Sequence, residues 1–259
     1  METLKLSILY LGRLEMLKKH LVDCDSDTQT IPCLIPAVLI KHPVLGNILY
    51  DTGCTPLYAA DHSRVILDNY PVVEFVSIEQ ALAEKGLKPS DIDILILSHL
   101  HFDHAGGLRY FQGTRAFKHI IISKGDFKQA FHEATDHAES AYCRPLFNLP
   151  GIHFSPINAT CTLTDDITLF VQKCHTPGVI GLIVKTAHHG TIVITGDTIY
   201  TRESFEQQIP PGGHNLKSQK DFFINLEKIR SMKKELNATL FFGHDKEQIE
   251  KWSREGWID

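Results

Sequence analysis

The sequence has no long apolar segment. No stretch approaches the roughly 18 uninterrupted apolar residues of a transmembrane helix. The first twenty residues, METLKLSILYLGRLEMLKKH, contain neither a long apolar core nor a small-residue cleavage site. These absences argue against a membrane span and a cleaved secretory signal, so we expect a cytoplasmic protein with no membrane partner.

The sequence also lacks an excess of positive charge. Its 26 Lys and Arg residues are outnumbered by 31 Asp and Glu residues, which gives a formal net charge of −5. This balance argues against a surface built to hold nucleic acid or anionic lipid. We therefore expect no nucleic-acid partner.

The six cysteines include no C-x-x-C pair. Without that spacing, neither a thiolate zinc site nor a redox pair is indicated. In a chain of this length we expect buried, unreactive thiols instead. The cysteines are Cys24, Cys33, Cys54, Cys143, Cys161 and Cys174.

Internal repeats and low-complexity stretches are absent too. The 259 residues are 43% apolar and 22% charged, which is ordinary for a globular protein and sufficient for a substantial core. We expect a single domain spanning 1–259.

What the chain does contain is a series of short, β-branched stretches bounded by Gly, Pro, Asp or Asn, which predict strands. The predicted strands cover 6–10, 37–40, 47–50, 92–98, 120–123, 152–154, 168–172, 181–185, 191–195 and 239–242. Helices fall between them without strict alternation. This order favours sheets packed on each other with helices outside, rather than a doubly wound parallel sheet.

Three helices are indicated. Ser77 and Gln80 form a capping box before one helix, and Gly86 ends it. Apolar residues recur at steps of three and four over 217–236, which predicts a long helix, and 125–134 predicts another. The segment 142–151, YCRPLFNLPG, predicts a long loop that either covers the substrate or merely connects.

Fifteen histidines are many for this length, and ten of them have no partner at the spacing of metal ligands. We expect these ten to be solvated or hydrogen-bonded, with the pair at 188–189 in a hairpin turn. They are His20, His42, His62, His119, His132, His137, His153, His188, His189 and His214.

Four other potential ligands crowd into SHLHFDHAGG (98–107), directly after a predicted buried strand. On an extended chain His99 and His101 point the same way, and Asp103 continues that side. His104 can join them only if the chain turns, which the two glycines at 106–107 would permit. Imidazole and carboxylate ligands suit zinc, manganese, iron or cobalt, so the stretch predicts a metal site.

Three further donors each follow a predicted strand: His175 in QKCHTPG, Asp197 in IVITGD and His244 in TLFFGHD. One metal would need three or four ligands, and two would need about seven. Donors placed repeatedly at strand ends are what a site at the rim of a sandwich of sheets requires. Together with the first cluster they predict one shared metal site.

The motif HLHFDH (99–104) matches the H-x-H-x-D-H signature of the metallo-β-lactamase superfamily, and the later donors follow in that family's order and approximate spacing. SHLHFDHAGG, GDTIYTRESFE (196–206) and FFGHDKEQ (241–248) make the chain similar to its N-acyl-homoserine lactonase branch, the quorum-quenching enzymes. The resemblance implies an α/β fold, as a four-layer αβ/βα sandwich. It also suggests a homodimer.

The resemblance further implies two divalent metal ions, with Zn²⁺ the first expectation and Co, Mn or Fe the alternatives. One ion would be held by His99, His101 and His175, the other by Asp103, His104 and His244, with Asp197 and a hydroxide between them. Asp51 in LYDTG (49–53) would orient a ligand histidine through a hydrogen bond. Phe102 would line the acyl-chain pocket.

The sequence departs from the family at one place. Family members often read GHTPGHQS around the third histidine, whereas this chain reads CHTPGVIGL (174–182). Cys174 thus replaces a glycine, and Val179 replaces a histidine. Neither position is expected to bind metal.

The resemblance implies a lactonase that opens the ring of an acyl-homoserine lactone by attack of the bridging hydroxide. Tyr200 would donate a hydrogen bond to the substrate, and Asp103 would deliver a proton to the leaving oxygen. A hydrolase of another lactone or of a thioester, as in glyoxalase II-like enzymes, is the alternative. Lys246, Lys251 and Arg254 would then serve an anionic thiol carrier.

Three other classes are less favoured. The missing export signal argues against a β-lactamase, and the negative net charge argues against a nuclease. A metal-stabilised sensor without activity is opposed by the full ligand set and by Tyr200.

Overall fold

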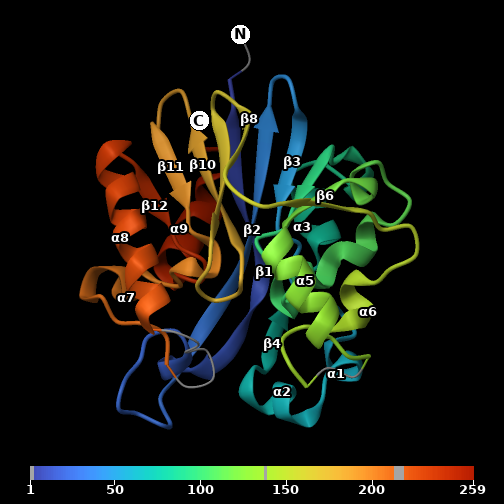
Figure 1. Cartoon of the computed structure of the whole chain (residues 1–259). Helices are drawn as coiled ribbons and strands as arrows, with labels where there is room; N and C mark the ends of the chain where they lie inside the picture. Colours follow the sequence, from blue (N-terminus) through green and yellow to red (C-terminus); the bar gives the residue numbers. More distant parts are fainter. Residues whose placement is uncertain (1–2, 137–138, 213–218) are drawn as a thin grey trace.

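A computed structural model describes residues 3–136, 139–212 and 219–259. These residues form two β-sheets stacked on each other, with helices on the outer faces (Figure 1). The predicted four-layer α/β sandwich is confirmed.

The first sheet is mixed and has the strand order β4-β1-β2-β3-β5-β6-β7. The pairs β4-β1, β1-β2 and β2-β3 are antiparallel, whereas β3, β5, β6 and β7 run parallel to one another. Its strands are β1 (Lys5–Leu17), β2 (Thr30–His42), β3 (Gly46–Tyr50), β4 (Val72–Phe75), β5 (Ile94–Ile96), β6 (Ile120–Ser123) and β7 (Phe154–Ile157).

The second sheet has the order β12-β11-β10-β9-β8 and is antiparallel except for the pair β11-β12. Its strands are β8 (Cys161–Thr164), β9 (Ile167–Gln172), β10 (Val179–Lys185), β11 (Thr191–Ile194) and β12 (Thr239–Phe241). The hairpin that joins β10 and β11 contains residues 188–189, as predicted.

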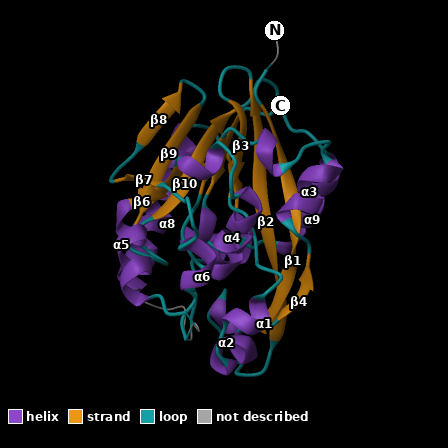
Figure 2. Ribbon diagram, turned by 90° about the vertical axis from the view of Figure 1, so that its right-hand side faces the viewer, coloured by secondary structure: helices purple, strands orange, loops and turns teal. Residues whose placement is uncertain are grey.

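The α-helices of the described residues are α1 (Tyr58–Asp61), α2 (Arg64–Asn69), α3 (Ile78–Glu84), α4 (Phe102–Ala105), α5 (Lys124–Glu133), α6 (Arg144–Phe147), α7 (Arg202–Gln207), α8 (Gln219–Glu235) and α9 (Lys246–Glu255). Short 3-10 turns lie at η1 (Lys18–His20), η2 (Pro89–Asp91), η3 (Gly106–Phe111), η4 (Ala116–Lys118) and η5 (Gly196–Thr198). The helix α4 lies near the middle of the molecule (Figure 2).

Strand periodicity explains the layers. Along β1, Leu6 and Ile8 face the second sheet and pack with Ile180 and Leu182, while Leu9 belongs to the cluster on the opposite face. That outer cluster includes residues of α3, α5 and α6. On the far side, α7 and α8 cover the second sheet. Each sheet is thus buried on both faces over much of its length.

Most of the predicted elements are present with shifted ends. β1 and β2 are much longer than predicted, because β1 continues beyond a bulge at Gly12, where φ is 104°. The prediction of 152–154 was wrong except for its last residue, since β7 begins at Phe154. Ser77 caps α3 by accepting from the Gln80 N–H, and Gly86 follows the helix with φ 71°.

Two strands and six α-helices of the described residues were not predicted. They are β4, β8, α1, α2, α4, α6, α7 and α9. The edge strands β4 and β8 are mostly solvent-accessible and therefore carry little hydrophobic signal. The loop prediction for 142–151 was wrong in part, because Arg144–Phe147 form α6. The predicted helix 217–236 is α8, although 217–218 lie outside the described residues, as do His137 and His214.

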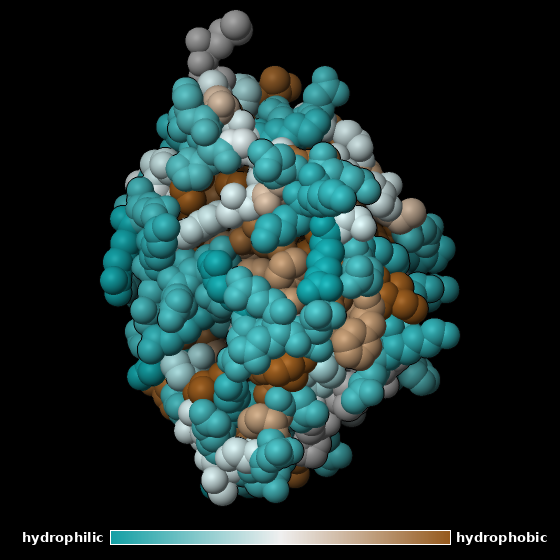
Figure 3. All heavy atoms as spheres, turned by 90° about the vertical axis from the view of Figure 1, so that its left-hand side faces the viewer, coloured by the Kyte–Doolittle hydropathy of each residue, from teal (hydrophilic) through white to brown (hydrophobic). Residues whose placement is uncertain are grey.

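No helix among the described residues has both the length and the apolar character that crossing a bilayer would demand. The face that carries α7 and α8 is mainly hydrophilic, broken by separate apolar patches (Figure 3). Separate patches of this kind are normal on a protein surface. The homodimer therefore stays a prediction.

Candidate metal centre

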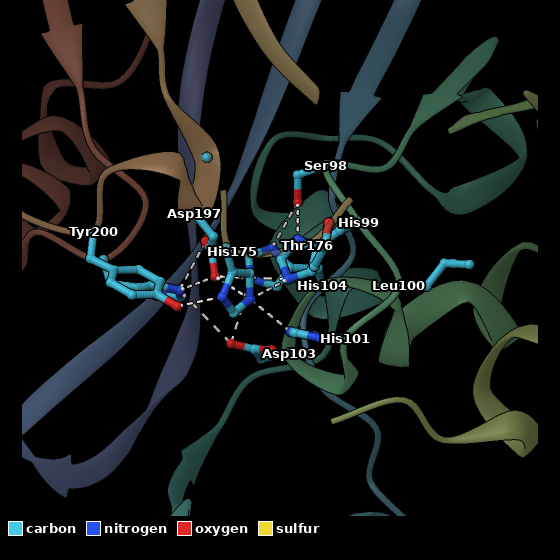
Figure 4. A network of polar contacts seen from close by, with 12 residues as sticks. Ser98, His99, Leu100, His101, Asp103, His104, His175, Thr176, Asp197 and Tyr200 are labelled. Atoms are coloured by element: carbon cyan, nitrogen blue, oxygen red, sulfur yellow. Dashed lines mark hydrogen bonds and ion pairs between the residues drawn. The ribbon is translucent and has the colours of Figure 1, made fainter. Parts of the chain in front are cut away.

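The seven predicted metal ligands meet where strands of both sheets end (Figure 4). The first of them follow β5, His175 lies between β9 and β10, Asp197 lies in η5 after β11, and His244 follows β12. Donors that follow different strands in the sequence therefore come together at one edge of the stacked sheets.

The first cluster reaches the centre in a different way from the predicted one. The chain is extended only as far as His101, and Asp103 and His104 enter from one turn of helix, α4. Gly106 has an ordinary helical φ of −62°. A side chain at Gly106 would lie 2.5 Å from the backbone of Cys54. That close approach, rather than a tight turn, is what requires glycine there.

Potential ligand atoms fall into overlapping groups, within each of which the atoms lie no more than 4.8 Å apart. We call His99, His101 and His175 the three-histidine half, and Asp103, His104 and His244 the mixed half. A third group joins His99 and His104 to Asp197. The three groups share members, so the ligand residues form two adjoining sites.

Distances within the three-histidine half are short. His175 Nε2 lies 3.2 Å from His99 Nε2 and 2.8 Å from His101 Nδ1. The carboxylate of Asp197 lies between the halves: its Oδ2 is 3.6 Å from His175 Nε2, and its Oδ1 is 3.2 Å from His244 Nε2. Asp197 is therefore able to contact cations in both.

These residues fit a pair of metal ions. The buried atoms His104 Nε2 and Asp197 Oδ1 lie 3.4 Å and 3.2 Å from charged partners, but neither makes a hydrogen bond of acceptable geometry with a described residue. Such atoms cost free energy unless something satisfies them. Neutral imidazoles and carboxylates are good ligands for zinc and similar divalent ions.

A second layer of hydrogen bonds turns the imidazoles toward the centre. His104 Nδ1 donates to Asp51 Oδ2 across 2.8 Å, and the Ser98 N–H donates to Asp51 Oδ1 across 2.7 Å. His244 Nδ1 donates to the carbonyl of Leu34 across 2.7 Å. Bonds at Nδ1 leave Nε2 free to bind a metal.

Ser98 was not singled out from the sequence. Its hydroxyl lies 2.9 Å from His99 Nδ1 and 3.2 Å from His104 Nδ1, and its main chain binds Asp51. The signal that could have found it is its place directly before the first histidine of the motif.

The electrostatics of the two halves differ. Burial and the neighbouring imidazoles of His104 and His101 hold the pKa of His99 well below its ordinary value. Burial would also lower the pKa of His104, but Asp197, Asp103 and Asp51 outweigh it and raise that pKa well above the ordinary value. Without a cation, His104 is thus a charged partner of the carboxylates.

A cavity lies over the cluster. His101, Asp103, His175, Asp197 and His244 reach it, together with Phe102 and Tyr200. The remaining walls are Leu14, Met16, Leu21, Cys33, Tyr70 and Ala141. The hydroxyl of Tyr200 lies 2.7 Å from His175 Nδ1, and the Phe102 ring packs 5.0 Å from that of Tyr58, centroid to centroid.

The two unusual residues of CHTPGVIGL lie outside this cavity. Cys174 is half-buried against the cluster under α8, and burial raises its pKa to about 12. Val179 is fully buried at the start of β10. Neither residue lines the cavity over the metal ligands.

The remaining histidines that the structure describes belong to none of the ligand groups. His42 Nε2, for example, lies 3.1 Å from Asp166 Oδ1, far from the centre in the fold. None of the described cysteines is in a disulfide.

Comparison with known proteins gives one consistent result. Residues 30–244 match the Metallo-beta-lactamase superfamily. The N-acyl homoserine lactonase of Bacillus thuringiensis is 28% identical over 230 residues, which cover 83% of this chain and 86% of that protein.

Solved structures agree. A quorum-quenching N-acyl homoserine lactone lactonase is 25% identical, with a TM-score of 0.81 over 100% of this chain and 99% of that one. An N-acyl homoserine lactone hydrolase with N-hexanoyl-L-homoserine at its catalytic metal centre is 24% identical, with a TM-score of 0.80 over 97% of each chain. This chain therefore belongs to the metallo-beta-lactamase superfamily, as a metal-dependent hydrolase related to the N-acyl homoserine lactonases.

Proposed function

We propose that this protein opens the lactone ring of N-acyl homoserine lactones. The observation that carries the proposal is the cavity over the metal ligands: most of its other walls are apolar, and no Lys or Arg of the described residues lines it. A neutral ester with an acyl chain suits such a cavity, because apolar walls favour the chain and no anion needs a partner. The relatives that hydrolyse these lactones support the same substrate class.

We propose as metal ligands the seven residues that meet at the centre, with two zinc ions as the first expectation: His99, His101, Asp103, His104, His175, Asp197 and His244. When bound, two such ions supply a hydroxide nucleophile near neutral pH and polarise the carbonyl of the substrate. Asp51 would act through His104, to which it is hydrogen-bonded.

Tyr200 is suited to donate to the substrate. A histidine that binds metal through Nε2 carries its proton on Nδ1, so the N–H of His175 would donate to the Tyr200 oxygen across 2.7 Å. The Tyr200 hydroxyl then keeps its own proton for the carbonyl oxygen or the amide of the substrate. Burial holds the pKa of Tyr200 well above its ordinary value, so this proton stays in place at neutral pH.

Asp103 is suited to carry a proton. Although burial would raise its pKa, His104 and His244 outweigh that effect and lower it, so the group is a carboxylate at neutral pH. It can accept the proton that the attacking hydroxide loses and return it to the ring oxygen when the C–O bond breaks. Phe102, on the same cavity wall, would contact the acyl chain.

The thioester alternative is less well supported. Lys246 and Arg254 line a separate cavity with Arg13 and Glu74, and Lys251 pairs with Glu255 across 3.6 Å. An anionic thiol carrier would therefore lack these cations at the metal-site cavity. A neutral lactone has no such requirement.

The test is metal analysis coupled to a panel of lactone, thioester and phosphodiester substrates. We expect about two metal ions per chain and ring-opened product from acyl-homoserine lactones at neutral pH. Intact lactones after incubation with fully metal-loaded protein, alongside cleavage of a thioester, would overturn the proposal.

A further inference from the structure

The segment 142–151 begins with a buried phenol that the proposed reaction does not use. Tyr142 is 1% exposed, and its hydroxyl donates to Asp126 Oδ1 across 2.5 Å. Asp126 lies in the first turn of α5 and is fully buried. Burial and the Asp126 carboxylate raise the pKa of Tyr142, so the phenol remains a donor.

The Asp126–Tyr142 pair reaches the metal ligands through the main chain. Asp126 Oδ2 accepts the N–H of Leu100 across 2.9 Å, and the carbonyl of Ala141 accepts the N–H of Phe102 across 3.0 Å. These are the two N–H groups on either side of His101. In Figure 4 the side chain of Leu100 points away from the cluster, as alternation along an extended chain requires.

The ring of Tyr142 also contacts the ligand itself. Its centroid lies 4.5 Å from that of His101, with the planes at 63°. The Tyr142 side chain therefore touches one member of the three-histidine half directly and is linked through Asp126 to the main chain beside it.

A purely structural role does not explain these polar groups. A buried carboxylate costs free energy unless it is fully paired, and an apolar pair of similar volume would fill the same space at less cost. Asp126 Oδ2 accepts from the Leu100 N–H, and Oδ1 accepts from the Tyr142 hydroxyl. Both bonds restrict where His101 can point.

We propose that Tyr142, acting through Asp126, is a positioning residue that fixes His101 for metal binding by the three-histidine half. The inference rests on the metal-binding part of the proposed function. It does not depend on which ester is hydrolysed, because its test needs no substrate.

The experiment compares Tyr142→Phe with the unchanged protein. Metal-free protein is titrated with Zn²⁺ against a chromophoric chelator, and with Co²⁺ while the visible absorption spectrum is recorded. Loss of partners that orient a ligand costs about 10- to 100-fold in metal affinity. We expect one of the two zinc affinities to fall by this factor, the other to stay, and the Co²⁺ spectrum of one site to change.

A second variant keeps the test decisive if Tyr142→Phe folds poorly. Asp126→Asn retains the volume of the side chain but can no longer accept from both donors, so it should weaken the same affinity. Tyr142 acts on His101 through Asp126, so the two substitutions should not be additive. The double variant should bind zinc with about the same affinity as the more affected single variant.

Tyr58→Phe is the matched control. Its hydroxyl, also from a mostly buried tyrosine, donates to the carbonyl of Tyr70 across 2.7 Å, so the same atom and the same kind of bond are lost. We expect lower thermal stability with both zinc affinities unchanged. If Tyr142→Phe and Asp126→Asn likewise lower stability but leave both zinc affinities within about twofold, the inference is wrong. That result would leave the proposed lactone hydrolysis unaffected, because hydrolysis is measured separately on the unchanged protein.

Discussion

The three-histidine half and the mixed half of the metal centre lie side by side and share Asp197, yet they differ in charge. In the first, the pKa of His99 is held well below its ordinary value by burial and by other imidazoles. In the second, burial would lower the pKa of His244, but Cys33 and Asp197 raise it well above the ordinary value. His99 is thus held as a neutral donor, whereas His104 and His244 are held as charged partners of the carboxylates before a cation arrives.

Their outer supports also differ. His104 of the mixed half donates to a carboxylate, that of Asp51, across 2.8 Å. In the three-histidine half, His99 faces the hydroxyl of Ser98, and His175 faces the phenol of Tyr200. The comparison teaches that a carboxylate bonds an imidazole directly only at His104 among these outer contacts. His244 donates to the neutral carbonyl of Leu34, and the carboxylate of Asp126 reaches His101 only through the main chain.

The largest effect is expected where the two halves meet. Asp197→Asn removes the charge that faces His175 at 3.6 Å and His244 at 3.2 Å. We expect metal content below one ion per chain after dialysis and a fall in lactone hydrolysis of more than about 100-fold, the upper range for loss of a mere outer partner. Elemental analysis and an activity assay measure both.

Asp166→Asn is the control for that variant, because the Asp166 carboxylate also faces an imidazole, that of His42, across 3.1 Å. Neither residue belongs to a group of metal ligands in the described part of the chain. The control variant should keep both metals. If Asp197→Asn instead keeps one tightly bound metal, the carboxylate serves only one half, and the shared role assigned to it fails.

The charge difference itself is tested in the metal-free protein. His104→Gln removes a cation that balances Asp197, Asp103 and Asp51. His101→Gln instead removes an imidazole of the three-histidine half, which lies against His99, His175 and Tyr142. Breaking a buried charge pair costs about 3–5 kcal/mol. We expect His104→Gln to lower the free energy of unfolding by that amount and His101→Gln by clearly less, measured with urea in the presence of a chelator.

The sign of the pH dependence gives this prediction a second check. The pKa of His104 is raised in the folded state, so its stabilisation is fully present below the unfolded pKa and is lost as pH rises through the folded pKa. The difference between His104→Gln and His101→Gln should therefore shrink at alkaline pH. A gap that widens with pH would contradict the charge assignment.

A smaller effect is expected from the outer support of the mixed half. Asp51→Asn removes the charge that holds His104, and asparagine tolerates the left-handed φ of 65° at this position. We expect the metal affinity of the mixed half to fall by about 10- to 100-fold, with the three-histidine half unchanged, in the same chelator competition.

Ser98→Ala is the matched neutral change, since it deletes a hydroxyl that lies 2.9 Å from His99 Nδ1 and 3.2 Å from His104 Nδ1. Its effect should be smaller than that of Asp51→Asn, because neutral hydrogen bonds contribute less than charged ones. Equal losses in the two variants would remove the distinction between charged and neutral support.

The sequence was informative where the chemistry is local. The spacing of His99, His101 and His104 lies within six residues, and Asp197 and His244 each follow a strand whose β-branched residues are easily recognised. The order of strands and helices, without strict alternation, likewise favoured stacked sheets. Such features depend on neighbours in the chain, so a single sequence reveals them.

Features that depend on distant contacts were not predictable. Asp126 and Tyr142 are separated from His101 by 25 residues or more, and only the fold brings them together. The carbonyl of Leu34 that orients His244 leaves no trace in side-chain pattern. Asp103 reaches the centre on a helical turn, α4, whose position is set by packing. A helix of four residues is too short to show a helical pattern in the sequence.

The smallest effect is expected at the departure from the family motif. Cys174 is next to His175 in the chain, but it packs under α8 and does not line the cavity. Restoring the family residue with Cys174→Gly should cost about 0.5–1 kcal/mol of stability through chain flexibility. Because no ligand contact changes, lactone hydrolysis and metal content should stay within about twofold, a change of under 0.5 kcal/mol. A tenfold change in rate at unchanged metal content would mean that this position shapes the three-histidine half through the main chain of His175, and the contrast between the halves would then have to include it.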